Sequence, residues 1–125
     1  AKLTKSTTSV DTSPDMWIHW VSTYFVDPEN WIGQMYDSQF QGTWKNSSWY
    51  TNPELDKLLS DARESVDQAD RQKIYEKAWQ ILVGDATDLW VYNTVSLRGL
   101  SKRVAGFKFS PVGSGSDFRW LSVKE

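Results

Sequence analysis

The sequence lacks cysteine, which excludes disulfide bonds and thiolate metal sites. Its one histidine, His19, cannot form a metal site built from several histidines, and the carboxylates show no calcium-loop spacing. The 14 basic residues are outnumbered by 16 acidic ones and form no basic stripe, which argues against nucleic-acid binding. We therefore expect no metal, no cofactor and no nucleic-acid partner.

Long apolar runs are missing too. None approaches the roughly 20 residues needed to span a bilayer. No charged segment followed by an apolar one opens the sequence, so no signal peptide is recognised. Either the protein is cytosolic, or a leading part has been removed.

Catalytic motifs are equally scarce. There is no G-x-S-x-G nucleophile elbow, and the Gly-Ser-Gly-Ser run near residue 113 lacks the spacing and lysine of a phosphate-binding loop. Two carboxylate pairs, Asp27 with Glu29 and Asp85 with Asp88, have the chemistry of a glycosidase. Turn capping and solvation are the simpler interpretation of both pairs. We expect no catalytic residue and no enzyme.

Tryptophan, in contrast, is abundant, with eight in 125 residues. A chain of this length ordinarily forms one domain with a modest core. Indole rings supply large buried area and an N–H group that needs a partner. They suit a core, and they also suit a site that stacks on flat or ring-shaped ligands.

Two central helices are the clearest elements. Asn52-Pro53 is a helix start, because asparagine caps free N–H groups and proline fits the first helical position. The spacing predicts helices over 53–66 and from Asp67 to Gly84, with Gly84 as a C-terminal cap and a short antiparallel link. The expected apolar stripes are Leu55, Leu58, Leu59, Ala62 and Val66, then Ile74, Ala78, Ile81 and Leu82, widened by Tyr75 and Trp79.

Strands are expected on either side of these helices. Residues 1–14 read as an exposed lead-in, and residues 16–21 as a strand with both faces partly buried. A turn at Asp27-Pro28 precedes a short helix over 31–36. Residues 89–97 and 107–109 favour further strands, the first of them buried.

The first expected strand ends in an aromatic-rich loop, where binding groups are commonly placed. Trp20 and Tyr24 are the candidate ligand contacts, with His19 and Ser22 as polar candidates. For Trp20 and Tyr24 a place in the core is an equally good interpretation. For His19 the alternative is a packed or hydrogen-bonded strand residue.

The order of several short segments resembles a known family. They are Tyr50-Thr51-Asn52-Pro53-Glu54-Leu55-Asp56-Lys57-Leu58-Leu59, Ala62-Arg63, Asp67-Gln68-Ala69-Asp70-Arg71, Tyr75-Glu76-Lys77-Ala78, Val91-Tyr92 and Val104-Ala105-Gly106-Phe107. Together they are similar to the C-terminal stretch of the family 5 solute-binding proteins, the dipeptide, oligopeptide and nickel receptors of ABC importers. The resemblance covers roughly residues 15–121.

This resemblance implies an α/β fold class, the C-terminal part of a two-lobed, type II periplasmic-binding-protein-like fold with a central helical hairpin and flanking strands. Residues 1–86 would belong to the distal ligand-binding lobe, and residues 87–125 would return to complete the first lobe. Family members are several times longer, so the resemblance implies a fragment and accounts for the missing signal peptide. It also implies a periplasmic or extracellular, membrane-associated protein that delivers a peptide or related solute to a membrane permease.

The chain departs from the family in its ligand loop, which there resembles W-G-A-D-Y-P-D-P. Aligning on Asp27-Pro28 places Tyr24 where peptide receptors carry the aspartate that pairs with the peptide ammonium. Tyrosine supplies no full negative charge near neutral pH. An oligosaccharide ligand would suit the aromatic residues, whereas a shifted alignment would make Asp27 the charged contact.

Two other classes remain open on sequence alone. A small glycosidase would use Asp27 or Glu29. A stand-alone carbohydrate-binding module would present exposed tryptophans as a stacking platform, but such modules are mostly β-structure, whereas two helices are expected here.

Overall fold

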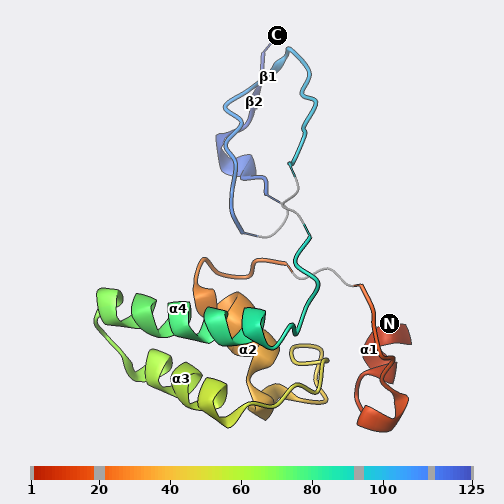
Figure 1. Cartoon of the computed structure of the whole chain (residues 1–125). Helices are drawn as coiled ribbons and strands as arrows, with labels where there is room; N and C mark the ends of the chain where they lie inside the picture. The colour runs from red at the N-terminus through yellow and green to blue at the C-terminus, as the bar shows by residue number, and fades with distance from the viewer. Residues whose placement is uncertain (1, 19–21, 92–94, 113–114, 125) are drawn as a thin grey trace. The chain divides into compact units, whose positions relative to one another are not determined.

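The computed structural model describes residues 2–18, 22–91, 95–112 and 115–124 (Figure 1). They combine helices with short strands in two compact units. Unit 1 comprises Ala1–Trp20 and Asp27–Leu89, and unit 2 comprises Val21–Val26 and Trp90–Glu125.

A helical hairpin dominates unit 1. It consists of α3, Pro53–Glu64, and α4, Gln68–Gly84. The Asn52 side chain accepts hydrogen bonds from the backbone N–H groups of Glu54 and Leu55, at 3.0 and 3.2 Å, which confirms the predicted cap. Asp67 caps α4 in the same way through the N–H of Asp70, at 2.9 Å. Both helix starts are therefore fixed by local side chains.

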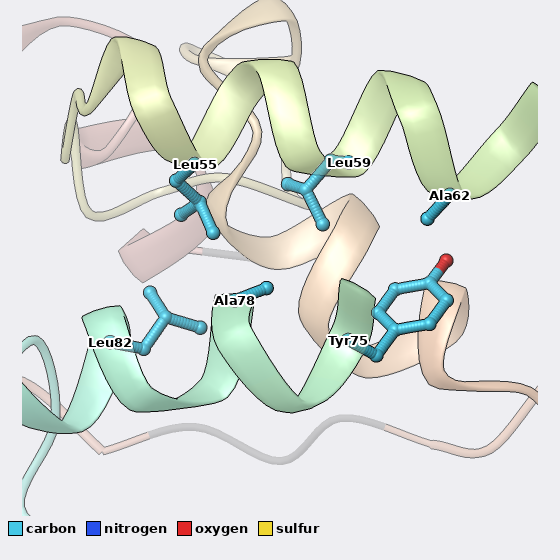
Figure 2. Packing of buried hydrophobic residues seen from close by; sticks show 6 residues of the cluster. All are labelled: Leu55, Leu59, Ala62, Tyr75, Ala78 and Leu82. Carbon is cyan, nitrogen blue, oxygen red and sulfur yellow. The ribbon is translucent and has the colours of Figure 1, made fainter. Parts of the chain in front are cut away.

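The core lies between these two helices. Figure 2 shows α3 and α4 running antiparallel, as predicted, with Leu55 near Leu82 at one end and Ala62 near Tyr75 at the other. The buried cluster consists of Leu55, Leu59, Ala62, Tyr75, Ala78 and Leu82, with Ile32, Tyr36, Tyr50, Ile74 and Ile81 packed against it. Of this last set, Ile32, Tyr36 and Tyr50 come from outside the hairpin, whereas Ile74 and Ile81 belong to α4.

Three details of the predicted helices are wrong. Val66 is fully exposed, because α3 ends at Glu64 and leaves it in the link. Trp79 is 43% exposed and is not part of the buried cluster between α3 and α4. Gly84 is the last residue of α4, and the chain turns instead at Ala86, whose φ is 51°. An alanine in that left-handed region is uncommon.

The N-terminal residues are also more ordered than the exposed lead-in expected from composition. They form α1, Lys2–Ser6, and η1, Val10–Thr12. Trp49 Nε1 donates hydrogen bonds to the Thr7 carbonyl oxygen at 3.2 Å and to Ser13 Oγ at 3.0 Å. Because an indole N–H needs a partner when it is partly buried, Trp49 holds this segment to the loop before α3. Thr7 is buried.

Short helical turns link the loop to the hairpin. They are η2, Glu29–Gly33, then α2, Gln34–Tyr36, and η3, Ser38–Phe40. The helix predicted over 31–36 is therefore confirmed. It brings Ile32 and Tyr36 onto the hairpin core.

Unit 2 contains a small antiparallel sheet of β1, Val104–Ala105, and β2, Ser122–Val123, with η4, Phe118–Trp120, before β2. Gly106, with φ of 75°, follows β1, and a Cβ there would lie 1.9 Å from the Trp120 carbonyl oxygen. Residues 107–109 were predicted as a strand but do not form one, and the strand nearest to them is β1 at Val104–Ala105. Phe109 makes only an isolated bridge to Ser116.

The other predicted strands are absent from the described residues. Residues 16–18, 89–91 and 95–97 have no strand, and the remainder of both predictions lies outside the described residues. Side chains expected to be buried are exposed, including Ile18 at 94% and Leu97 at 91%. Strands form only against a hydrogen-bonded neighbour, and no described segment pairs with these residues. The division into two lobes at residue 86 stays a prediction.

Candidate functional site

The predicted ligand contacts are only partly described. Ser22 and Tyr24 lie in unit 2, in a loop without helix or strand, and Tyr24 is 58% exposed. His19 and Trp20 lie outside the described residues. The structure therefore places two of the four on an exposed loop and does not bring all four together.

Asp27, the alternative charged contact, is engaged within unit 1. Arg71 of α4 forms a two-pronged ion pair with it, with Nη1 to Oδ2 at 2.6 Å and Nη2 to Oδ1 at 2.7 Å. Asp27 Oδ1 also accepts the backbone N–H of Glu29 at 2.8 Å. The Arg71 guanidinium, together with that N–H, holds the pKa of the Asp27 carboxyl below its ordinary value.

Arg71 is itself held by more than Asp27. Its Nε donates to the Ala62 carbonyl oxygen of α3 at 3.1 Å, and its Nη2 lies 3.3 Å from Tyr75 Oη. The Arg71 side chain is 17% exposed and that of Asp27 is 29% exposed. The planar guanidinium thus joins α3, α4 and the turn before η2, a role that a lysine ammonium could not reproduce.

A second set of charges continues from this pair. Tyr75 Oη donates to Glu29 Oε2 at 3.0 Å, and Arg63 Nε donates to Glu29 Oε1 at 3.1 Å. Arg63 Nη1 also pairs with Asp37 at 2.7 Å. Burial raises the pKa of Tyr75, and the neighbouring Glu29 carboxylate raises it further. The charges of α3 and α4 therefore bind the segment from Asp27 to Asp37.

The four carboxylates considered above as glycosidase groups are all held by hydrogen bonds or ion pairs. Asp27 and Glu29 are both paired with arginines. Asp85 accepts hydrogen bonds from Tyr50 and Asn52, and Asp88 accepts one from Tyr36. A general acid requires a raised carboxyl pKa, whereas the pKa values of Asp27 and Asp85 are lowered by their hydrogen-bond partners. The geometry gives these residues structural roles.

An open pocket of about 570 Å³ lies along α4 beside Arg71. Ser22 and Tyr24 are not among its lining residues, which are Pro28, Ile32, Gln68, Arg71, Gln72, Tyr75, Glu76, Trp79 and Gln80. Its charged groups already have partners, since Arg71 pairs with Asp27 and Glu76 accepts from Gln72 at 2.8 Å. It offers an indole face and amide groups rather than a charged anchor.

The sequence pattern does not predict that Arg71 pairs with Asp27. Arg71 and Asp27 are 44 positions apart, and no local spacing links an arginine on one helix to a turn so distant. Among the described residues, no three histidine, cysteine or acidic side chains cluster as metal ligands. Within the same ranges, every helix is too short or too polar to cross a membrane.

Comparison with curated proteins finds several binding proteins. A probable D,D-dipeptide-binding periplasmic protein of Escherichia coli is 33% identical over 88 residues, 70% of this chain and 17% of that protein. Di/tripeptide-binding protein 1 of Pseudomonas aeruginosa is 30% identical over 90 residues, 72% of this chain and 17% of its own length. Heme-binding protein A of Haemophilus influenzae is 32% identical over 87 residues, which are 70% of this chain and 16% of that protein.

The chain thus spans about a sixth of the length of these relatives. No protein-family model matches it.

Proposed function

Because about 70% of this chain is similar in sequence to family 5 peptide-binding proteins, we propose that it is part of a solute-binding subunit of an ABC importer. The subunit captures a peptide or a related small solute without chemical change. The observation that carries this proposal is the similarity to several separately named peptide-binding proteins, at 30 to 33% identity.

Capture by such a protein would require a site that closes over its ligand and excludes water. We assign the ligand contacts to residues 19–24, with Trp20 and Tyr24 as aromatic contacts and His19 and Ser22 as hydrogen-bonding groups. The exposure of Tyr24 supports this assignment, since a core tyrosine would be buried. The loop carries no acidic residue between Asp15 and Asp27.

Asp27 is not assigned to the ligand. Its two carboxylate oxygens already accept three hydrogen bonds, two from Arg71 and one from the Glu29 N–H. An incoming ammonium would compete with a guanidinium that is held by two further groups, the Ala62 carbonyl oxygen and the Tyr75 hydroxyl. The shifted alignment, which would make Asp27 the charged contact, is therefore disfavoured.

The proposed location is the periplasm, where the name of the Escherichia coli relative places that protein. The proposed partner is the membrane permease of the importer, which would receive the solute from the closed receptor.

Calorimetric titration of the receptor polypeptide that carries this chain tests the proposal. The probes are L-Ala-L-Ala, D-Ala-D-Ala, tri-L-alanine, haem and maltotriose. We expect saturable binding of at least one alanine peptide. Binding of maltotriose alone would favour an oligosaccharide receptor, and absence of binding by every probe would refute solute capture.

Replacing Tyr24 by alanine tests the assigned contact. We expect affinity for the bound peptide to fall about tenfold, which corresponds to the loss of one well-placed aromatic contact. Phe118→Ala is the matched control, because Phe118 is an exposed aromatic residue of the same unit outside the loop. An unchanged affinity in Tyr24→Ala would remove Tyr24 from the site.

A further inference from the structure

Asp27 stands at the point where the chain passes from one unit to the other. It is the first residue of unit 1 after the loop 22–26, which belongs to unit 2. The loop has no helix or strand and is largely exposed. Asp27, in contrast, is held through its side chain by Arg71 and through its carbonyl oxygen, which accepts the Asn30 N–H at 3.0 Å. The covalent attachment of the loop to unit 1 is therefore fixed.

The Asp27–Arg71 pair differs from the exposed ion pairs of the hairpin. Lys57 pairs with Asp61 and Lys73 with Asp70, each pair lies within one helix, and the lysine side chains are 74% and 69% exposed. Such pairs contribute little. Arg71 makes two parallel hydrogen bonds to a residue 44 positions away and also bonds a carbonyl oxygen of α3. A bidentate pair of this kind fixes orientation as well as distance.

We propose that Arg71 is a positioning residue for the loop that carries Ser22 and Tyr24. It fixes Asp27, the anchor of that loop, against α3 and α4, and ligand affinity depends on it although it does not contact the ligand. The role of the loop in this inference rests on the proposed function. The anchoring itself rests on the contacts of Asp27 and Arg71 alone, so the two can fail separately.

The first test uses the 125-residue chain labelled with 3-fluorotyrosine. The chain has five tyrosines, and Tyr24→Phe identifies the fluorine resonance of Tyr24. In Arg71→Met we expect the Tyr24 resonance to shift or broaden while those of Tyr36 and Tyr50 stay in place, because their partners are Asp88 and Asp85. Lys57→Met, which breaks an exposed pair within α3, is the matched control and should move none of the three.

The outcomes of this test are distinct. An unchanged Tyr24 resonance in a folded Arg71→Met chain would overturn the proposal. If Arg71→Met unfolds, which the loss of the Tyr36 and Tyr50 resonances would reveal, Arg71→Lys decides. Lysine keeps the charge but not the two parallel bonds. It should move the Tyr24 resonance in the same direction, and no movement would again overturn the proposal.

The second test measures L-Ala-L-Ala affinity in the receptor polypeptide. Arg71→Met should weaken binding about tenfold, within the range of couplings through intermediate residues, and Lys57→Met should leave it unchanged. Equal affinity of the wild-type receptor and Arg71→Met would refute the positioning role. If the wild-type receptor binds no probe, the proposed function fails, and the fluorine resonances still decide whether Arg71 anchors the loop.

Discussion

Tyrosine hydroxyl groups hold carboxylates at three places in unit 1. Tyr75 bonds Glu29, while Tyr36 bonds Asp88 and Tyr50 bonds Asp85. Burial, followed by the hydrogen bond to Asp85, raises the pKa of Tyr50 to about 12. Asp88 and Asp85 follow α4, so the latter two bonds tie the end of that helix to earlier parts of the chain.

These bonds predict a loss of stability in alkali. The pKa of tyrosine in the unfolded chain is about 10.0, and that of Tyr50 in the folded chain is higher. A group of this kind stabilises the folded chain fully at a pH below its unfolded pKa. This contribution is lost as the pH rises through its folded pKa. The melting temperature should therefore fall between about pH 10 and pH 12. Tyr50→Phe should melt lower at neutral pH and lose less over that interval.

Thermal unfolding followed by circular dichroism at a series of pH values measures this effect. Tyr24→Phe is the control, because Tyr24 is 58% exposed and belongs to unit 2. Parallel curves for the wild-type chain and Tyr50→Phe would show that Tyr50 is not linked to stability in alkali.

Single residues also mark the limit of sequence reasoning. His19, Trp20, Ser22 and Tyr24 were identified from their place in an aromatic-rich loop, and their contact with a ligand remains a prediction. Arg71 could not be found in this way, because its significance depends on Asp27, 44 positions earlier in the chain. A pair so distant becomes visible only when the hairpin has brought α4 beside the turn.

At the scale of elements, the hairpin of α3 and α4 carries the core. Leu59 is fully buried between them, whereas Val66 in the link is fully exposed. Leu59→Ala should lower the free energy of unfolding by about 2–5 kcal/mol, since it removes buried methyl groups and leaves a cavity. Val66→Ala should change it by less than about 0.5 kcal/mol.

Urea unfolding followed by helical circular dichroism measures both variants. A cost for Leu59→Ala no larger than that for Val66→Ala would mean that the hairpin interface is not the core of unit 1.

The cap of α3 gives a second test at this scale. Asn52→Ala removes the acceptor for the N–H groups of Glu54 and Leu55 and should cost about 1 kcal/mol. The Asn52 side-chain amide also donates a hydrogen bond to Asp85 at 3.2 Å, so part of the loss of stability in Asn52→Ala would come from that contact. Asn52→Ser separates the two, because serine keeps a capping oxygen but has no amide to donate to Asp85 and adds no charge beside it. Equal stability of Asn52→Ala and the wild-type chain in urea would contradict the cap.

The elements show why some predictions succeed and others fail. Helices close their hydrogen bonds within a few residues, so caps and periodicity are sufficient to predict α3 and α4. Strands form their backbone hydrogen bonds with segments that are distant in the sequence. Residues 89–91 and 95–97 have the composition of strands, yet no described segment pairs with them.

At the scale of the whole molecule, the matched part of the chain corresponds to 16 to 17% of the length of the relatives named above. Unit 2 leaves many apolar side chains exposed, among them Val95 at 82% and Leu97 at 91%. Single exposed apolar residues are ordinary on a protein surface, but this number of them in one small unit is consistent with a surface that contacts another segment or chain. The predicted return of residues 87–125 to a first lobe is one way to cover it.

The most direct measurement of the central claim is a fluorescence titration of the receptor polypeptide with L-Ala-L-Ala and D-Ala-D-Ala. Eight tryptophans in this chain provide the signal. We expect a saturable change with at least one of the two peptides, and no chemical change in the peptide recovered afterwards. A flat titration with both, in a receptor shown to be folded by its cooperative melting, would contradict the central claim.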